Sequence, residues 1–154
     1  MKGHDVIMDS LIKNDIQYYS GEHFLQTHCT NPLITEATIT NAVEYYFENL
    51  KTYDSLLAVN KIQCRLYKAD GSPLNHLLNS MERTQDMKPI WKESSSFFIF
   101  SKKTFLQNLS RVGRHPTLFD INEIESIDID YENDFTLAEI VFENKNRFPN
   151  IFNL

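Results

Sequence analysis

The sequence predicts an α/β domain, and three observations lead to that prediction. The chain has 154 residues, 42% of them hydrophobic, which suits one domain with a hydrophobic core and is too short for two. Short apolar runs typical of buried strands alternate with segments whose apolar residues recur at helical spacing. A strand, a helix and a second strand follow one another between residues 23 and 59, an order that favours a right-handed crossover in a parallel sheet. We therefore expect a single domain over residues 1–154.

The first elements follow from local patterns. A short amphipathic helix is expected between Asp5 and Asn14, and "HFLQTH" (residues 23–28) then predicts a strand. Thr35 can cap a second helix, and "SLLAV" (residues 55–59) has the continuous apolar character of a buried strand. The apolar residues that support the two helices are Val6, Ile7, Leu11 and Ile12 in the first, and Ile39, Val43, Tyr46, Phe47 and Leu50 in the second.

The middle of the chain predicts a hairpin that projects from the sheet. The segments "IQCRLY" and "LNHLL" flank Asp70-Gly71, a dipeptide that accepts positive φ at low cost. "SFFIF" (residues 96–100) predicts another buried strand, followed by a helix through Phe105 and Leu109. The next segment, "RVGRHPTLFD", contains both glycine and proline and is expected to be a loop.

The last part of the chain combines an extended segment with a helix. "ESIDID" (residues 125–130) predicts extended backbone, and Asp130 can cap a helix that carries Phe135, Ala138, Val141 and Phe142. In extended backbone alternate side chains share a face, so Asp128 and Asp130 should point the same way while Ile127 and Ile129 face the core. Two adjacent carboxylates suit Mg²⁺, which takes one or two protein carboxylates and leaves positions for water and phosphate. The alternative is that Asp130 only caps the helix and Asp128 is solvated.

Composition excludes several classes of function. No apolar run is long enough to span a bilayer, and the start "MKGHDVIMDS" lacks the layout of a secretory signal. A cytoplasmic protein without membrane association is therefore expected, with Cys29 and Cys64 as reduced thiols, because their spacing suggests neither a disulfide framework nor a zinc site. The net charge of −6 argues against broad nucleic-acid binding, which requires a basic face.

Two further segments carry candidate binding residues. "QTHCTNPL" (residues 26–33) follows a predicted strand, where open α/β sheets bind their ligands, and it offers Gln26, Thr27, Thr30 and Asn31 as polar groups. An ordinary strand-to-helix loop with Asn-Pro turn chemistry explains it equally well. "ERTQDM" (residues 82–87) offers Gln85 and Arg83, whose guanidinium can grip a carboxylate or phosphate. A surface ion pair is the simpler account of that segment.

Taken together, "FLQTHCTNPL", "YDSLLAV", "RTQDM", "SSFFIFS" and "IESIDIDYENDFTLAE" resemble, in this order and spacing, the acylneuraminate cytidylyltransferase family. Members make CMP-activated sialic and other nonulosonic acids from CTP. The resemblance implies a Rossmann-like sheet of the glycosyltransferase-A type, dependence on Mg²⁺, and a homodimer formed through a protruding arm at about residues 64–90. Position by position, it implies that Asp128 and Asp130 bind the metal, that Gln26 lies near nucleotide and sugar, and that Arg83 and Gln85 of the arm approach the acidic sugar.

The sequence departs from this family at two places. Ser94-Ser95-Ser96 stands where the family often has Asn before its strand. The family also opens with a basic, glycine-containing loop, roughly "PARGGSKG", that holds the triphosphate, and no such loop occurs here. We therefore expect a nucleotidyltransferase domain that is incomplete at its N-terminus and impaired when alone. The alternatives are a non-catalytic homologue that acts as an oligomerisation or binding module, and a second polypeptide that supplies the loop.

Overall fold

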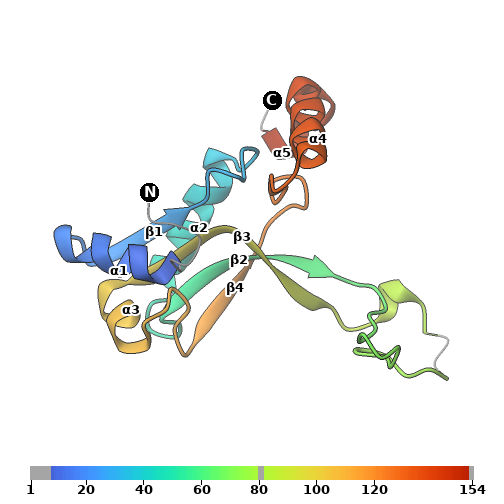
Figure 1. Ribbon diagram of the computed structural model, residues 1–154, viewed down its shortest axis with the longest axis horizontal. Helices are drawn as coiled ribbons and strands as arrows, with labels where there is room; N and C mark the ends of the chain where they lie inside the picture. The colour runs from blue at the N-terminus through green and yellow to red at the C-terminus, as the bar shows by residue number, and fades with distance from the viewer. Residues whose placement is uncertain (1–7, 80–81, 153–154) are drawn as a thin grey trace.

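A four-stranded open sheet forms the centre of the protein (Figure 1), in a computed structural model that describes residues 8–79 and 82–152. The third strand along the chain is antiparallel to both the first and the second, and the second is parallel to the fourth. The predicted α/β class is confirmed, but the first two strands are not neighbours, because the third lies between them. The strands, in spatial order, are β1 (His23–Thr27), β3 (Ile90–Ser101), β2 (Ser55–Ile62) and β4 (Pro116–Asp120).

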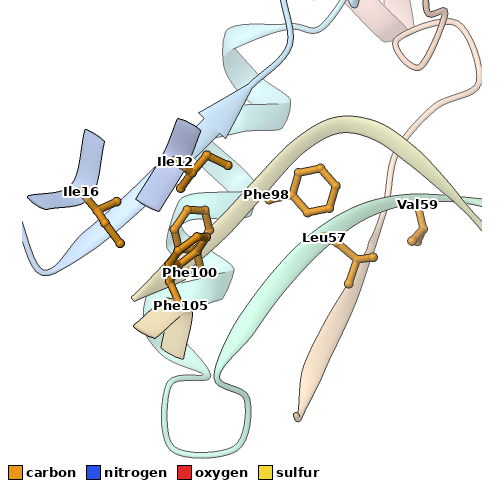
Figure 2. Close-up of a cluster of buried hydrophobic side chains, with 7 residues drawn as sticks. All are labelled: Ile12, Ile16, Leu57, Val59, Phe98, Phe100 and Phe105. Carbon is orange, nitrogen blue, oxygen red and sulfur yellow. The ribbon is translucent and has the colours of Figure 1, made fainter. Parts of the chain in front are cut away.

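Helices cover both faces of this sheet. On one face, α1 (Met8–Tyr18) and α3 (Lys102–Asn108) enclose a cluster of buried apolar side chains (Figure 2). On the other face, α2 (Glu36–Glu48) covers a second cluster. Because successive strand residues point to opposite faces, continuous apolar runs supply both clusters. The first contains Ile12, Ile16, Leu57, Val59, Phe98, Phe100 and Phe105, and the second contains Ala42, Tyr46, Leu56, Ala58, Phe97, Ile99 and Ile121.

The helix predictions are correct in kind and inexact in detail. Thr35 caps α2 as predicted, and its hydroxyl oxygen accepts a hydrogen bond from the Thr38 N–H. Phe47 and Leu50 were expected on the buried face of α2, yet both are exposed because Ala42 and Tyr46 meet the sheet. Helix α1 continues to Tyr18, beyond the predicted end at Asn14. The predicted contributions of Val6 and Ile7 lie outside the described residues.

Two predictions for the second half of the chain are wrong. Part of the expected loop "RVGRHPTLFD" is strand β4, which tolerates Pro116 because the residue begins the strand at an edge of the sheet. The segment "ESIDID" is a turn over residues 123–126 followed by irregular backbone, so it is not a strand. The segment leads into α4 (Glu132–Glu143), η2 (Lys145–Arg147) and α5 (Pro149–Phe152). These elements pack around a third, smaller core that contains Leu33.

The arm leaves the sheet between β2 and β3 and includes the short helix η1 (Thr84–Asp86), as Figure 1 shows. The hairpin predicted there is present only in part. The turn forms, with φ of 81° at Gly71 and the Lys68 N–H donating to the Ser72 carbonyl at 2.8 Å, but the flanking segments are not strands and meet in one isolated bridge between Tyr67 and Pro73 in the part of the arm that the structure describes. The Asp70 carboxylate accepts hydrogen bonds from the Ser72 hydroxyl and N–H, which lowers the pKa of Asp70. Leu74, Leu77 and Leu78 are exposed, whereas Met81, assigned to the same patch, lies outside the described residues.

None of the helices described for this chain combines the length and the apolar composition needed to cross a bilayer.

Candidate functional site

A cleft of about 700 Å³ lies at the carboxyl ends of β2 and β4. One wall consists of the end of β2 and the beginning of β3, and the other consists of the segment between β4 and α4 together with the first turns of α4. Open α/β sheets bind ligands at the carboxyl ends of their strands. Asp128 and Asp130 both line this cleft, so the structure brings the predicted pair together in a place suited to a ligand.

The two aspartates line the cleft, and the isoleucines between and before them contact the core. Ile127 and Ile129 both pack against the cluster that contains Leu33, but Ile127 also lines the cleft, so the alternation expected of extended backbone holds only in part. Asp128 is half-buried, and its Oδ1 is buried without a hydrogen-bond partner in the described part of the chain. A buried carboxylate oxygen without a donor is costly. A cation, a water molecule or a bound proton would each satisfy it.

Contacts from the loop after β1 hold this segment in place. The Thr30 carbonyl accepts a hydrogen bond from the Ile129 N–H at 2.8 Å. Asn31 is 2% exposed, and its side-chain amide donates to the Ile127 carbonyl at 3.2 Å. Neither residue lines the cleft. Within this chain, the predicted binding residues Thr30 and Asn31 therefore contact the backbone of the segment that carries the two aspartates.

Glu125 is a further positioning residue, and the sequence analysis missed it. Its carboxylate is 5% exposed and accepts hydrogen bonds from the Thr35 hydroxyl at 2.7 Å and the Thr35 N–H at 3.0 Å. These bonds tie the start of α2 to the segment just before Asp128. Thr35 and Glu125 are 90 residues apart, so no local signal relates them.

The beginning of α4 corrects the predicted role of Asp130. Tyr131, not Asp130, is the N-cap residue, and the Asp134 carboxylate accepts the N–H groups of Tyr131 at 2.9 Å and Asp130 at 3.2 Å. Asp134 therefore does the capping from within the first turn, as the acidic member of a capping box does. The carboxylate of Asp130 has no hydrogen-bond donor among the described residues, and Asp130 lines the cleft.

Acidic groups dominate the cleft. Lys92 is the sole cationic residue among the described residues that line it. The carboxylates are those of Glu93, Glu123, Asp128, Asp130 and Asp134. The described residues contain no cluster of three or more His, Cys, Asp or Glu side chains suited to holding a metal. A pair of carboxylates with open positions nevertheless fits Mg²⁺, which takes few protein ligands and retains water.

A distorted stretch of β3 forms part of the cleft wall, and it too was missed. Ser94 to Phe97 lie opposite the single residue Ala58 of β2, because the register shifts between Leu57 and Val59. Ser95, which lines the cleft, has φ of 62°, a conformation that is unfavourable for a non-glycine residue. The hydroxyls of Ser94 and Ser96 are 2.8 Å apart and stabilise the bulge. Strain of this kind concentrates at functional sites, and the three consecutive serines are the available sequence signal.

The predicted residues of β1 lie apart from the cleft. Gln26 accepts a hydrogen bond from Arg111 Nη1 at 2.7 Å and donates its amide to His28 Nε2 at 2.9 Å. Arg111 also lies 4.1 Å from the centre of the Phe98 ring and 3.3 Å from an oxygen of Asp9. Thr27 is exposed on the same strand. The structure therefore places Gln26 in a network centred on Arg111, a residue that sequence analysis did not identify.

The predicted residues of the arm are also remote from the aspartates in this chain. Arg83 forms an exposed ion pair with Asp86, with Nε and Oδ2 2.7 Å apart, as the simpler interpretation expected. Gln85 is exposed, and its carbonyl accepts a hydrogen bond from the Gln63 amide at 2.7 Å. Neither Arg83 nor Gln85 lines the cleft.

Comparison with known proteins confirms the fold class. No protein-family model matches the chain. The chain is 24% identical over 148 residues to post-translational flagellin modification protein B of Campylobacter coli, an alignment that covers 92% of this chain and 62% of that protein. The crystal structure of 4-diphosphocytidyl-2C-methyl-D-erythritol synthase from Anaerococcus prevotii superimposes with a TM-score of 0.63 at 9% identity, covering 90% of this chain and 68% of the synthase. The chain therefore has an open α/β sheet like that of the synthase, and it spans about three fifths of the length of the curated relative.

Proposed function

We propose that this chain is part of a cytidylyltransferase-type nucleotidyltransferase. The parent reaction is transfer of CMP from CTP to a nonulosonic acid of the sialic type, with release of pyrophosphate. The observation that carries the proposal is the pair Asp128 and Asp130 in one cleft at the carboxyl ends of the strands, with Asp128 Oδ1 buried and without a partner among residues 8–79 and 82–152. Carboxylates to which the described residues donate no hydrogen bond are suited, at this position, to a metal that meets phosphate.

The comparisons support this class of reaction. The synthase that shares the fold is named for a diphosphocytidyl product, and the curated relative is named for modification of flagellin. The ordered motifs of this chain add the resemblance to acylneuraminate cytidylyltransferases. The name of the relative and the resemblance together favour a nonulosonic acid as the acceptor.

We assign a separate role in the proposed reaction to each group of residues in and beside the cleft. Asp128 and Asp130 hold Mg²⁺, which when bound neutralises charge on the phosphates of the nucleotide. Thr30, Asn31 and Glu125 keep the segment that carries the two aspartates in place. Lys92 supplies one positive charge to a bound polyanion.

The proposed binding of the acidic sugar requires a second copy of the chain. Arg83 and Gln85 do not line the cleft of their own chain, and three exposed leucines lie on the same arm. In a homodimer formed through this arm, they would approach the partner's site, where the Arg83 fork can bind a carboxylate. Gln26 and Thr27 lie apart from the cleft of their own chain, so their proposed contact with nucleotide or sugar rests on the family resemblance alone, and Arg111 orients Gln26.

We also propose that this chain alone turns over CTP poorly. Phosphoryl transfer depends on charge neutralisation and positioning. The described lining of the cleft supplies five carboxylates and one lysine, which leaves a triphosphate weakly held even with the metal present. A pyrophosphate-release assay with sialic acid, CTP and Mg²⁺ is expected to give no detectable product, and robust turnover would contradict this part of the proposal.

Metal binding tests the central claim directly. Mn²⁺ can replace Mg²⁺, and its effect on water proton relaxation reports binding. We expect weak binding that strengthens at least about tenfold when CTP is added, because phosphate oxygens complete the coordination shell. The double variant Asp128→Asn with Asp130→Asn should lose that gain. Glu123→Gln is the matched control, because it removes another carboxylate of the cleft and should retain the gain.

If the double variant binds Mn²⁺ and CTP as tightly as the parent, the two aspartates are structural and the proposed site is wrong.

A further inference from the structure

A second cavity lies at the amino ends of β2 and β4, at the opposite end of this parallel pair from the cleft that Asp128 and Asp130 line. Its volume is about 330 Å³, which falls in the lower part of the range of small-molecule pockets. Its walls come from the start of β1, the end of α2, the segment between α2 and β2, helix α3 and the residue before β4. Figure 1 shows this end of the sheet beside α3 and away from α4.

The charged groups of this cavity are mainly cationic. Lys51 and Lys103 both line it, and neither forms an ion pair among residues 8–79 and 82–152. His23 and His115 line it too. Asp54 is the one acidic residue in the described lining, and its carboxylate already accepts hydrogen bonds from one hydroxyl and two backbone N–H groups. The chain has a net charge of −6, so these unpaired cations do not belong to a generally basic surface.

Two polar residues that line the cavity are almost fully buried and are held in place. Thr104 is 7% exposed, and its hydroxyl donates to the Asp54 carbonyl at 3.0 Å. Tyr46 is 2% exposed, and its hydroxyl oxygen lies 3.0 Å from His23 Nδ1. Burial, and secondarily the charge of Asp54, raises the pKa of Tyr46 to about 12, so at neutral pH the phenol is protonated and can donate to His23 Nδ1. A neutral His23 ring then carries its proton on Nε2 and can donate it to a ligand.

We propose that this cavity binds a diphosphate group through the ammonium groups of Lys51 and Lys103. The imidazole N–H groups of His23 and His115 are further donors to its oxygens. Lysine binds phosphate as a point charge, and a diphosphate carries enough negative charge to pair with both lysines at once. Inorganic pyrophosphate and a nucleoside diphosphate share this chemistry. The site requires neither a metal nor the acidic cleft, so the proposal stands or falls separately from the proposed function.

Titration of the metal-free protein, followed by NMR through the imidazole signals of His23 and His115, tests the proposal. Metal is removed on a chelating resin, because anion binding at the acidic cleft requires a cation. The probes are pyrophosphate and CDP. At least one of them should shift both imidazole signals with a Kd below about 1 mM, and the tighter of the two identifies the source of the diphosphate. Succinate, a dianion without phosphate, should bind at least about tenfold more weakly than that probe.

Two pairs of lysine variants separate binding in the cavity from general attraction of an anion. Lys51→Gln with Lys103→Gln removes both cations of the cavity and should weaken binding of the tighter probe at least about tenfold. Lys13→Gln with Lys68→Gln is the matched control, because it removes the same charge from two exposed lysines that do not line the cavity. The control should bind within about twofold of the parent. All four lysines are exposed, so both double variants should fold, as far-UV circular dichroism would verify.

Three results would overturn the proposal. The first is the absence of any shift in the two imidazole signals at millimolar concentrations of both probes. The second is equal weakening by the two pairs of lysine variants, which would reduce binding to long-range attraction. The third is equal affinity for succinate and for the tighter phosphate probe, which would show that the cavity accepts any dianion.

Discussion

Aspartates lie at both ends of the parallel pair β2 and β4, but only those at one end have hydrogen-bonded carboxylates. Before the strands, the Asp54 carboxylate accepts hydrogen bonds from the Ser55 hydroxyl at 3.0 Å, the Arg114 N–H at 2.8 Å and the His115 N–H at 3.2 Å. Beyond the strands, Asp128 and Asp130 receive no hydrogen bond to their carboxylates from the described residues, and one oxygen of Asp128 is buried.

This difference separates a structural acid from one that is available to a ligand. At the amino end, backbone donors satisfy the charge, and Asp54 closes the loop before β4. At the carboxyl end, the loop after β1 and Glu125 fix the backbone of the segment, but nothing described satisfies the carboxylates themselves. A carboxylate that the fold positions but leaves without donors adds little to stability and is free to bind a cation.

Replacing one aspartate at each end should give the largest difference in stability between the two ends. Asp54→Ala removes the acceptor of the buried Ser55 hydroxyl and of the N–H groups of Arg114 and His115, which are exposed residues, and should lower the free energy of unfolding by roughly 1–2 kcal/mol. Asp128→Asn removes only repulsion between carboxylates and should leave stability within about 0.5 kcal/mol of the parent. Urea denaturation of both variants measures the difference, and equal losses would remove the distinction drawn here.

The close approach of Gly113 to Asp54 offers a second test of the amino end. A Cβ at Gly113 would overlap the Asp54 carboxylate, so Gly113→Ala should destabilise the protein by about 1–3 kcal/mol. The matched change Gly71→Ala has no atom within 4 Å of the added Cβ and carries only the strain of φ 81°, about 1 kcal/mol. Thermal unfolding should therefore rank Gly113→Ala below Gly71→Ala, and the reverse order would show that the Asp54 loop adapts freely.

Tyr46, whose pKa responds to Asp54, should make the stability of the protein depend on pH. Burial, and secondarily the negative charge of Asp54, raises the pKa of Tyr46 from 10.0 to about 12. The folded state therefore favours the neutral phenol, so this stability is fully present below pH 10 and is lost as pH rises from 10 towards 12. We expect a loss of roughly 1–2 kcal/mol over that window.

Tyr46→Phe should flatten the pH dependence of stability above pH 10, as measured by denaturation at pH 9, 10 and 11. Tyr131→Phe is the control, because Tyr131 is 77% exposed and its replacement should leave the dependence unchanged. If both variants keep the parental dependence, Tyr46 does not couple folding to pH.

The smallest expected effect concerns the carboxyl end. Ser95→Gly relieves a left-handed φ of 62° and should stabilise the protein by about 0.5–1 kcal/mol. Ser95→Ala retains the strain and should not stabilise. If Ser95→Gly stabilises the protein and leaves CTP-dependent Mn²⁺ binding unchanged, the backbone strain is not needed for binding. If binding weakens, the Ser95 hydroxyl takes part in it.

Short-range patterns predicted the parts of the molecule that short-range physics decides. Thr35 was recognisable as a helix cap, and the two aspartates could be placed on one face because Ile127 and Ile129 alternate with them. Strand β4 was missed because proline argues against a strand unless the strand lies at an edge, which the sequence does not reveal. Asp130 was a reasonable candidate cap, but Asp134 reached the same N–H groups from within the helix.

The remaining features depend on contacts that are distant in sequence. Glu125 reaches Thr35 across 90 residues, and Arg111 reaches Gln26 across 85. The left-handed Ser95 arises where β3 loses register against β2. Each of these requires the folded arrangement of several strands, and no local periodicity carries that information.

The bulge in β3 separates the base of the arm from the part of the strand that is buried in the core. Beyond the bulge, Ile90 to Glu93 pair with Val59 to Ile62 to form the root of the arm, and Lys92 and Glu93 of that root line the cleft. On the other side of the bulge, Phe97 to Phe100 are immobilised in the core. The base of the arm is therefore also a wall of the cleft, so a shift of the arm at the three serines would change the position of Lys92 and Glu93 relative to Asp128 and Asp130.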